Sequence, residues 1–395
     1  MGGLRPALLA LEDGTVFRGF AYGAAGTACA EVVFHTSMAG YTEILTDPSY
    51  RGQFVTFSYP LIGNYGVSPD DHESDRFQAE GVVVREATTS GGVAPELEPL
   101  LAERGVVGIR GVDTRALVRR LREAGVLKGC IDSTGLAASE LVDRARAHPE
   151  VTGGDFVDRV SAPAAYDFED PVPPGPAPAG PGGVSASFVP RPVPAPLAGA
   201  APRVAVVDCG VKRSILRQLA ERGARVRVYP ARVARAELLA WRPDGVVFSN
   251  GPGDPVDVPH VVDLAASLIG TLPVLGICLG HQVLARALGM ETYKLRYGHH
   301  GGNHPVGEIA TGRVAITSQN HNYCVRWDEA RARDWEPTLR NLNDGTLEGF
   351  RHRSLPVTAI QFHPEAGPGP HDARPAFDDF ARTLAPARAA GTGTM

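Results

Sequence analysis

The stretch PVLGICLGHQVLARALG (273–289) joins a short apolar run to a segment with helical spacing through a single cysteine. Cys278 directly follows the apolar run, and Gly276 and Gly280 flank it. Glycines permit a sharp turn and close backbone approach, and a helix N-terminus stabilises a thiolate. This pattern is typical of a nucleophile elbow, in which a strand delivers a reactive side chain to the start of a helix. The alternative is a cysteine that fills the core, which needs no glycine on either side.

The rest of the second half continues this alternation of strand and helix patterns. Apolar runs at 203–210, 224–230, 244–255 and 273–278 alternate with helical patterns at 214–223, 236–243, 258–269 and 281–289. Such alternation predicts an α/β fold, with an open, mostly parallel sheet that carries helices on both faces. Residues 261–280 are apolar enough to suggest a membrane span. Because Asp263, Gly270 and Pro273 interrupt the run, it is better interpreted as a helix followed by a buried strand.

A nucleophilic thiol needs a base, and the base needs a group that orients it. His363 follows the apolar run VTAIQF (357–362), so we expect it at the end of a strand. Glu365 comes two residues later, where an extended backbone returns a side chain to the same face. A surface histidine near a glutamate is the alternative for this pair alone. Together with Cys278, the pair predicts a Cys-His-Glu triad.

Two further motifs could contribute to a site. The glycines of SNGPGDP (249–255) leave backbone N–H groups free to approach a ligand, as an oxyanion hole requires. A phosphate loop is disfavoured because no GK[ST] follows, and an ordinary glycine-rich turn is the remaining alternative. In GHHGGNHP (298–305), adjacent histidines on a strand point to opposite faces. No cysteine or carboxylate is spaced to complete a metal site, so we expect a structural or site-lining loop.

The first half predicts a mixed α/β domain over residues 1–162. It contains a hairpin with a turn at Asp13-Gly14, three strand-like runs (EVVFHTS, QFVTFSYP and AEGVVVRE) and a helix over 113–125 that Asp113 can cap. Residues 163–202 hold 12 of the 33 prolines. We expect this stretch to be a semi-rigid linker that neither pairs into a sheet nor extends a helix, with a PxxP ligand as the alternative. Residues 203–388 then form the second domain and 389–395 a flexible tail.

Composition narrows the class of protein. Hydrophobic residues make up 43% and charged residues 21% of the 395, as in globular proteins. The net charge of −5 has the wrong sign for a dedicated nucleic-acid binder, and no targeting segment is visible. The five cysteines are an odd number, far apart and without CxxC spacing. Their pattern argues against a disulfide framework or a zinc site and for a reducing cytosol.

The motifs GICLGHQ, SNGPGDP and HPE together resemble a class I glutamine amidotransferase domain. Outside the proline-rich linker, the whole chain resembles the small, glutaminase subunit of carbamoyl phosphate synthetases. The motifs that carry this resemblance are EVVFHTSMAGYTEILTDPSYRGQ (31–53), DTRALVRRLREAG with KGC (113–130), GHHGGNHPV (298–306), QNHNYCV (319–325) and HPEAGPGPHD (363–372). The resemblance implies a flavodoxin-like second domain and a swivelling β/β/α-like first domain that docks to a large subunit.

The resemblance also implies a role for each matching residue. Cys278 is expected to be the nucleophile, His363 the general base and acid, and Glu365 the orienting group. The expected L-glutamine contacts are Ser49, Gly251, Gly253, Leu279, Gln282, Asn320, Asn322 and Tyr323. The family often has glycine where this chain has Asn322. Asparagine is among the residues that best tolerate a glycine-like backbone conformation, so a backbone contact there remains compatible.

The activity implied is hydrolysis of L-glutamine through a glutamyl thioester, with ammonia passed to the large subunit. That partner makes carbamoyl phosphate from bicarbonate and ATP for arginine and pyrimidine biosynthesis. ATP and Mg²⁺ are expected on the large subunit, and no cofactor or metal on this chain, which lacks a P-loop or an ATP-grasp-like segment. The expected assembly is a cytoplasmic heterodimer that can form higher oligomers, without nucleic acid or membrane.

Two other functions remain as alternatives. A class I amidotransferase subunit that serves a different synthase would share the triad motifs but not the first half. A scaffold subunit without hydrolytic activity would be expected to have lost the nucleophile or the base, and this chain keeps both.

Overall fold

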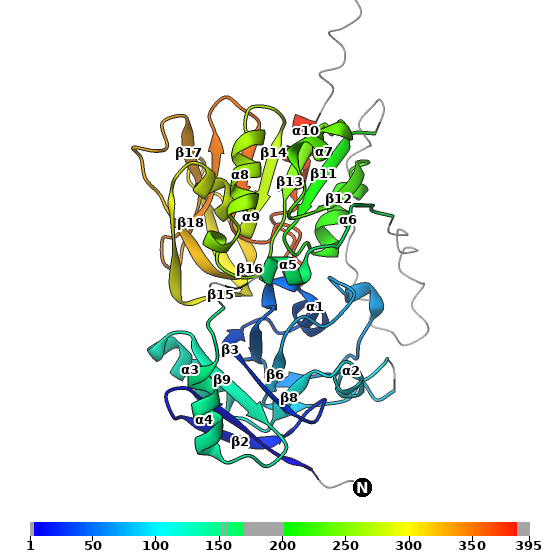
Figure 1. Ribbon diagram of the computed structural model, residues 1–395, viewed down its shortest axis with the longest axis vertical. Helices are drawn as coiled ribbons and strands as arrows, with labels where there is room; N and C mark the ends of the chain where they lie inside the picture. The colour runs from blue at the N-terminus through cyan, green and yellow to red at the C-terminus, as the bar shows by residue number, and fades with distance from the viewer. Residues whose placement is uncertain (1–3, 93, 152–153, 155, 170–200, 385–395) are drawn as a thin grey trace, which may run out of the picture.

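The protein consists of two bodies, one above the other in Figure 1. The computed structural model describes residues 4–92, 94–151, 154, 156–169 and 201–384. A barrel forms from the first half of the chain, and a layered α/β sheet forms from the second. Most of the predicted linker and the predicted tail at 389–395 lie outside the described residues.

The first body is a closed barrel of seven strands. Around the barrel these are β1 (Pro6–Leu11), β2 (Val16–Ala21), β8 (Val107–Arg110), β6 (Gly81–Val84), β4 (Gln53–Phe57), β3 (Thr27–His35) and β9 (Leu127–Asp132). The predicted hairpin is confirmed: Leu9 lies opposite Phe17, and Gly14 adopts a φ of 93° in the turn. The three strand-like runs predicted after the hairpin form β3, β4 and β6.

Short elements surround this barrel. They are α1 (Tyr41–Thr46), α2 (Leu97–Glu103), α3 (Thr114–Ala124), α4 (Ala138–Ala147), the 3-10 turns Pro48–Tyr50 and Pro69–Asp71, and the paired strands β5 (Leu61–Ile62) and β7 (Glu86–Ala87). The predicted helix over 113–125 is confirmed as α3. Asp113 Oδ1 accepts a 3.0 Å hydrogen bond from the Ala116 N–H, which satisfies one of the free donors at the helix start.

The second body is built on a ten-stranded sheet whose centre is parallel. Five neighbouring parallel strands, in sheet order, are β12 (Arg225–Pro230), β11 (Arg203–Asp208), β13 (Gly245–Phe248), β14 (Val274–Ile277) and β19 (Val357–Ile360). An antiparallel extension follows, with β18 (Leu347–His352), β17 (Trp335–Asn341), β15 (Glu291–Glu308) and β16 (Val314–Arg326). The sequence analysis predicted the parallel centre, but it did not predict this extension.

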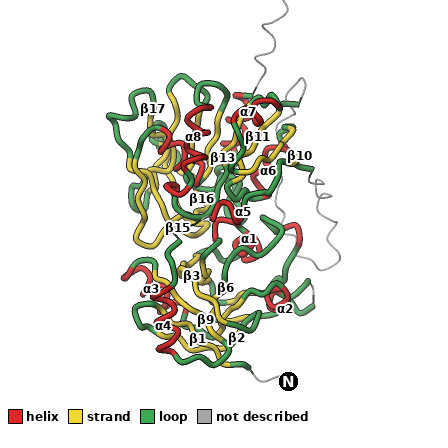
Figure 2. Tube along the Cα trace, in the orientation of Figure 1, coloured by secondary structure: helices red, strands yellow, loops and turns green. Residues whose placement is uncertain are grey.

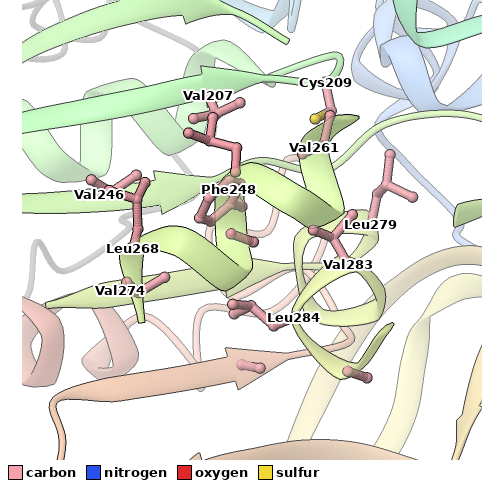
Figure 3. Close-up of a cluster of buried hydrophobic side chains, with 14 of the residues drawn as sticks. Val207, Cys209, Val246, Phe248, Val261, Leu268, Val274, Leu279, Val283 and Leu284 are labelled. Atoms are coloured by element: carbon pink, nitrogen blue, oxygen red, sulfur yellow. The ribbon is translucent and has the colours of Figure 1, made fainter. Parts of the chain in front are cut away.

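Helices cover both faces of the parallel strands, as predicted (Figure 2). One face carries α7 (Arg235–Ala240), α8 (Pro259–Leu268) and α9 (Leu279–Ala287), and the other carries α6 (Arg213–Glu221) and α10 (Pro375–Thr383). Figure 3 shows side chains of α8 and α9 packed against those of β11, β13 and β14. The apolar run 261–280 forms parts of α8 and α9 with β14 between them. Within the described ranges, the structure contains no helix that is long and apolar enough to cross a membrane.

The proline-rich stretch pairs into the sheet at its start, contrary to our expectation. Strand β10 (Tyr166–Asp167) runs antiparallel to β12, and the Phe168 N–H donates to the Val226 carbonyl at 2.9 Å. Residues 164–169 contain no proline, so their backbone donors are available for a sheet. The prediction for 163–202 was therefore wrong for these residues, and residues 170–200 lie outside the described ranges.

The residues just before this stretch pack against the second body. In α5 (Phe156–Val160), Val157 is 4% exposed and belongs to the core that α8 and α9 cover. The Ala162 N–H donates to Asp208 Oδ2 at 2.7 Å, and Ser161 Oγ accepts from the Ala231 N–H. Residues 156–162 were assigned to the first domain, but their contacts attach them to the second.

The prediction from the cysteine pattern, which argued against disulfides, was wrong for one pair. Cys29 on β3 and Cys130 on β9 stand directly opposite each other in the barrel and form a disulfide, with Cα atoms 4.1 Å apart. Their separation of 101 residues gave no sign of this pairing, because strand register alone brings them together. Cys209, Cys278 and Cys324 are free and buried.

Candidate active site

Cys278 occupies a strained turn between β14 and α9. Its φ is 55°, a left-handed conformation that is rare outside glycine, and it is the N-cap residue of α9. Gly276 and Gly280 leave no room for a side chain: a Cβ on Gly276 would collide with the Gly280 carbonyl, and one on Gly280 with the Phe248 carbonyl. The two glycines that the sequence analysis emphasised therefore allow this turn to close.

His363 and Glu365 follow β19 and lie side by side in the interior. His363 Nδ1 is 2.6 Å from Glu365 Oε1, and both side chains are almost completely buried. His363 Nε2 has no hydrogen-bond partner among the described residues. Burial lowers the pKa of His363, but the charges of Glu365 and Cys278 outweigh it and raise that pKa to about 10. The three residues thus form one electrostatic unit, with the imidazole between a carboxylate and a thiol.

A buried lysine completes the charge balance of this unit. Lys212, just before α6, places Nζ 3.0 Å from Glu365 Oε1 and 3.8 Å from Glu73 Oε1. Burial raises the pKa of Glu365, but Lys212 and His363 oppose it more strongly and hold that pKa at about 2. Burial likewise disfavours the charge on Lys212, yet the carboxylates of Glu365 and Glu73 raise its pKa above the usual value. Glu73 comes from the first body, so both halves of the chain hold this network.

The first body also reaches the site through the turn before β4. Asp47 accepts hydrogen bonds from the Ser49 N–H at 2.9 Å and from Asn320 Nδ2 at 2.8 Å. Ser49 Oγ accepts from Asn250 Nδ2 at 2.9 Å, which leaves the hydroxyl proton of Ser49 free to donate. One buried carboxylate therefore ties Ser49, from one body, to the strand β16 of the other.

His300 holds the two asparagines of β16. Its Nδ1 lies 3.0 Å from Asn320 Oδ1, and its Nε2 lies 3.0 Å from Asn322 Oδ1. Burial lowers the pKa of His300 to about 4, so the ring is neutral and has one donor and one acceptor. One of the two asparagines must therefore present its NH₂ group to the ring. Asn322 lies in a strand without a positive φ, so its contact with His300 does not use a glycine-like conformation.

A pocket opens beside Cys278 between the two bodies. Of the predicted residues it is lined by Cys278, Ser49, Gly251, Gly253, Gln282, Asn320, Asn322 and Tyr323. Leu279 does not line it: its side chain packs in the core (Figure 3), and only its N–H, which has no acceptor within α9, can face a ligand. Gly251 has no room for a side chain, because a Cβ there would collide with the Cys209 carbonyl.

Several lining residues were not singled out from the sequence. These are Glu31, Gln53, Val151, Pro252, Lys294 and His321. His300 comes from the loop 298–305, which was expected to be structural or to line the site, and it does line the pocket. Glu31 and Gln53 are the first and last residues of the motif 31–53, so their position in it was the only signal available. Lys294 had none, since a single lysine on a strand is more often a solvated surface residue.

A cluster of possible metal ligands adjoins the pocket, and His321 belongs to both. His299, His321 and Cys324 bring their possible ligand atoms within 4.8 Å of one another, and His299 Nε2 is 2.9 Å from Asp344 Oδ2. The sequence analysis found no cysteine or carboxylate spaced to join these histidines, and that conclusion was wrong. Both ring nitrogens of His321 already have partners, the Tyr323 carbonyl and Gln319 Oε1. The cluster thus belongs to the hydrogen-bonded support behind the pocket.

Comparisons with known proteins match each half of the chain to a family and match almost the whole chain to full-length relatives. Residues 9–131 match the family described as "Carbamoyl-phosphate synthase small chain, CPSase domain", and residues 205–383 match "Glutamine amidotransferase class-I". The chain is 46% identical to a carbamoyl phosphate synthase small chain of Akkermansia muciniphila over 382 residues, which is 96% of this chain and 97% of the relative. It is 43% identical to that of Chlorobaculum tepidum, covering 96% and 98% of the two chains. It is 46% identical to that of Syntrophotalea carbinolica, covering 95% and 96%.

Proposed function

The chain belongs to the family of carbamoyl phosphate synthase small chains, and from this premise we propose how it hydrolyses glutamine for that enzyme. The single observation that carries the proposal is the contact between His363 Nδ1 and Glu365 Oε1 at 2.6 Å beside Cys278. A thiol, an imidazole and a buried carboxylate in this order make an activated nucleophile. The activity is that of a glutamine-hydrolysing carbamoyl phosphate synthase, which serves arginine and pyrimidine biosynthesis.

In the first step the Cys278 thiolate attacks the side-chain amide carbon of L-glutamine. The carbonyl oxygen takes up negative charge, and the N–H groups of Leu279 and Gly251 stabilise it. The His363 imidazolium gives its proton to the amide nitrogen, the C–N bond breaks and ammonia leaves. A γ-glutamyl thioester then remains on Cys278. Because His363 carries the proton before the attack, its raised pKa suits this role.

In the second step water hydrolyses the thioester. His363, now neutral, takes a proton from the attacking water, and the C–S bond breaks to release L-glutamate. Glu365 keeps the imidazole in one orientation and balances its charge in both steps, without itself taking up the proton. Lys212 keeps Glu365 ionised.

Substrate binding follows from the lining of the pocket. The Ser49 hydroxyl, the backbone at Gly251 and Gly253, and the side chains of Gln282, Asn320, Asn322 and Tyr323 are proposed to hold the glutamine. Support for Gln282 comes from its amide: Nε2 donates to the Tyr323 carbonyl at 2.8 Å and to Gln361 Oε1, which leaves Oε1 free to accept from the substrate.

The proposed partner is the large subunit, which uses ammonia, bicarbonate and ATP with Mg²⁺, so that this chain itself needs no cofactor. The proposed assembly is a heterodimer that can associate further. The proposed location is the cytoplasm. It is supported by the free thiol of Cys278, because a catalytic thiol has to stay reduced, whereas a disulfide such as Cys29–Cys130 is less common in that compartment.

The test is reconstitution of the full chain with its large subunit. We expect ammonia release from L-glutamine and glutamine-dependent formation of carbamoyl phosphate. A complex that forms carbamoyl phosphate from added ammonia but not from glutamine would contradict the proposal. The alternative function, an amidotransferase subunit that supplies ammonia to a different synthase, is disfavoured. Residues 9–131 match the family of the carbamoyl phosphate synthase small chain, which such a subunit would not do.

A further inference from the structure

Phe156, at the start of α5, lies between two glycines that belong to different bodies (Figure 1). Gly52 of the first body has a φ of 85° and leaves no room for a side chain, because a Cβ there would lie 2.6 Å from Phe156 Cε1. Gly253 of the second body has a φ of 88°, and a Cβ there would lie 3.9 Å from Phe156 Cδ2. The phenyl ring therefore packs on one backbone turn with one edge and faces a second turn with the other.

Both turns contribute to the pocket that contains Cys278. The first turn supplies Ser49, three residues before Gly52, and the second supplies Gly251 and Gly253. The ring that lies between the turns is not part of the lining of this pocket. It can therefore influence a bound substrate only through the two turns that it touches.

The second turn has open space around it. Pro252 and Gly253 line the glutamine pocket and also a second, small cavity, and Phe156 lines that second cavity. A turn that borders two open spaces lacks the close packing that fixes most of a protein interior. Its start is held, because the Gly280 N–H donates to the Ser249 carbonyl at 3.0 Å. Phe156 is placed to limit the movement of the other end, at Gly253.

The helix that carries this ring is anchored to both bodies. Val157, the next residue, is 4% exposed in the core of the second body, and Asp158 Oδ2 lies 2.6 Å from Arg232 Nη2 in the same body. On the side of the first body, Arg76 Nη2 donates to the Arg159 carbonyl at 2.6 Å. The ring is thus held in place relative to both turns.

We propose that Phe156 is a positioning residue that sets the distance between the two turns of the glutamine pocket. This inference rests on the proposed glutaminase function and adds to it a residue that does not touch the substrate. Because Ser49 and Gly253 are proposed to hold glutamine, loss of the ring should weaken substrate binding. The triad and the start of the second turn keep their own contacts, so the chemical steps should change little. The expected signature is a raised KM at a nearly constant kcat.

The test measures the kinetics of ammonia release from L-glutamine in the complete complex with the large subunit. Phe156→Ala should raise KM about tenfold, with kcat within about threefold of wild type. Phe156→Leu keeps an apolar side chain beside Gly52, so it should hold KM within about threefold of wild type. Phe168→Ala is the matched control. It removes another half-buried phenylalanine, which follows the edge strand β10, and should leave KM unchanged.

A second pair of variants tests the same contact from the first body. Gly52→Ala places a methyl group against the Phe156 ring, so it should raise KM. Gly14→Ala introduces a side chain at a similar φ, 93°, with no atom within 4 Å, so it carries the backbone strain without the contact and should leave KM unchanged. In the double variant Gly52→Ala/Phe156→Ala the methyl group meets no ring. Its KM should therefore stay within about threefold of that of Phe156→Ala, instead of showing both increases.

The outcomes are distinct. A wild-type complex that releases no ammonia from glutamine would contradict the proposed function. A wild-type complex that hydrolyses glutamine with the same KM as Phe156→Ala would overturn only the positioning role. Equal increases of KM in Gly52→Ala and Gly14→Ala would overturn it as well. Carbamoyl phosphate synthesis from added ammonia should be unchanged in Phe156→Ala, and its loss would show that the ring serves assembly with the large subunit instead.

Discussion

Lys212 Nζ lies 3.0 Å from Glu365 Oε1, the same oxygen that contacts His363. The lysine ammonium and the imidazolium thus share one carboxylate in a region closed to water. Glu73 from the first body balances the second positive charge at 3.8 Å. His363 and Glu365 of the triad therefore form a four-residue charge network with Lys212 and Glu73, and each member depends on the others for its charge state.

Lys212→Met should damage both activity and stability. Without the ammonium, the buried carboxylates of Glu365 and Glu73 lose their partner, so the pKa of Glu365 rises and its hold on the His363 imidazolium weakens. We expect kcat for glutamine hydrolysis to fall at least about tenfold and the free energy of unfolding to fall by about 3–5 kcal/mol. Steady-state kinetics and urea unfolding measure the two effects. Lys128→Met is the control: it removes a half-buried lysine that pairs with Glu12 away from the active site, so it should leave kcat unchanged.

Cys278→Ser should abolish glutamine-dependent synthesis and spare synthesis from added ammonia. A hydroxyl is a far weaker nucleophile than a thiolate in the same turn. A glutamine-like electrophile should also label Cys278 before Cys209 or Cys324, because burial raises the pKa of both other thiols. Mass spectrometry of the labelled chain identifies the site. Glutamine hydrolysis at a near wild-type rate in Cys278→Ser would rule out this nucleophile.

Glu365→Gln should cost less activity than His363→Asn. Glu365 orients and balances the imidazole, whereas His363 moves the proton in both steps. We expect the two variants to differ by at least tenfold in kcat, which is about 1.4 kcal/mol. Equal losses would assign Glu365 a direct part in proton transfer.

The free energy of unfolding at acid pH should depend on the ionisation of Glu365. Its pKa is about 2 in the folded protein against 4.5 for the ordinary carboxyl, so the folded state holds its proton less tightly than the unfolded state. The stabilisation from this group is therefore present above pH 4.5 and is lost as the pH falls towards 2. Urea midpoints of wild type and Glu365→Gln should thus converge over that range. A constant difference between pH 7 and pH 3 would contradict the depressed pKa.

Asp47→Ala should raise KM for glutamine more than it lowers kcat. The change leaves Asn320 Nδ2 and the Ser49 N–H without their acceptor, so both glutamine-pocket residues lose their position while the triad keeps its contacts. We expect KM to rise about tenfold at a kcat within about threefold of wild type. Asp13→Ala, which removes an exposed ion pair with Arg120, is the control and should leave KM unchanged. A selective loss of kcat would show that Asp47 acts on the triad instead.

The local chemistry and the parallel core follow from the order of residues along the chain. The glycines around Cys278, the alternation of strands and helices, and the His-x-Glu spacing after a strand are all properties of neighbours in the chain. These local patterns predict structure directly, because the backbone has few sterically allowed conformations and because helices and strands have fixed side-chain periods. The hairpin at Asp13-Gly14 and the cap at Asp113 followed in the same way and were confirmed.

The contacts between residues far apart in the chain depend on how the whole chain packs. Glu73 beside Lys212, Asp47 beside Asn320 and Cys29 opposite Cys130 are separated by more than a hundred residues each, and strand register and the packing of two bodies bring them together. The same holds for Glu31 and Lys294, and for the attachment of residues 156–162 to the second body. Periodicity specifies which face of an element is buried. It contains no information on the partner that a buried charge finds there, because that partner is set by the packing of the whole chain.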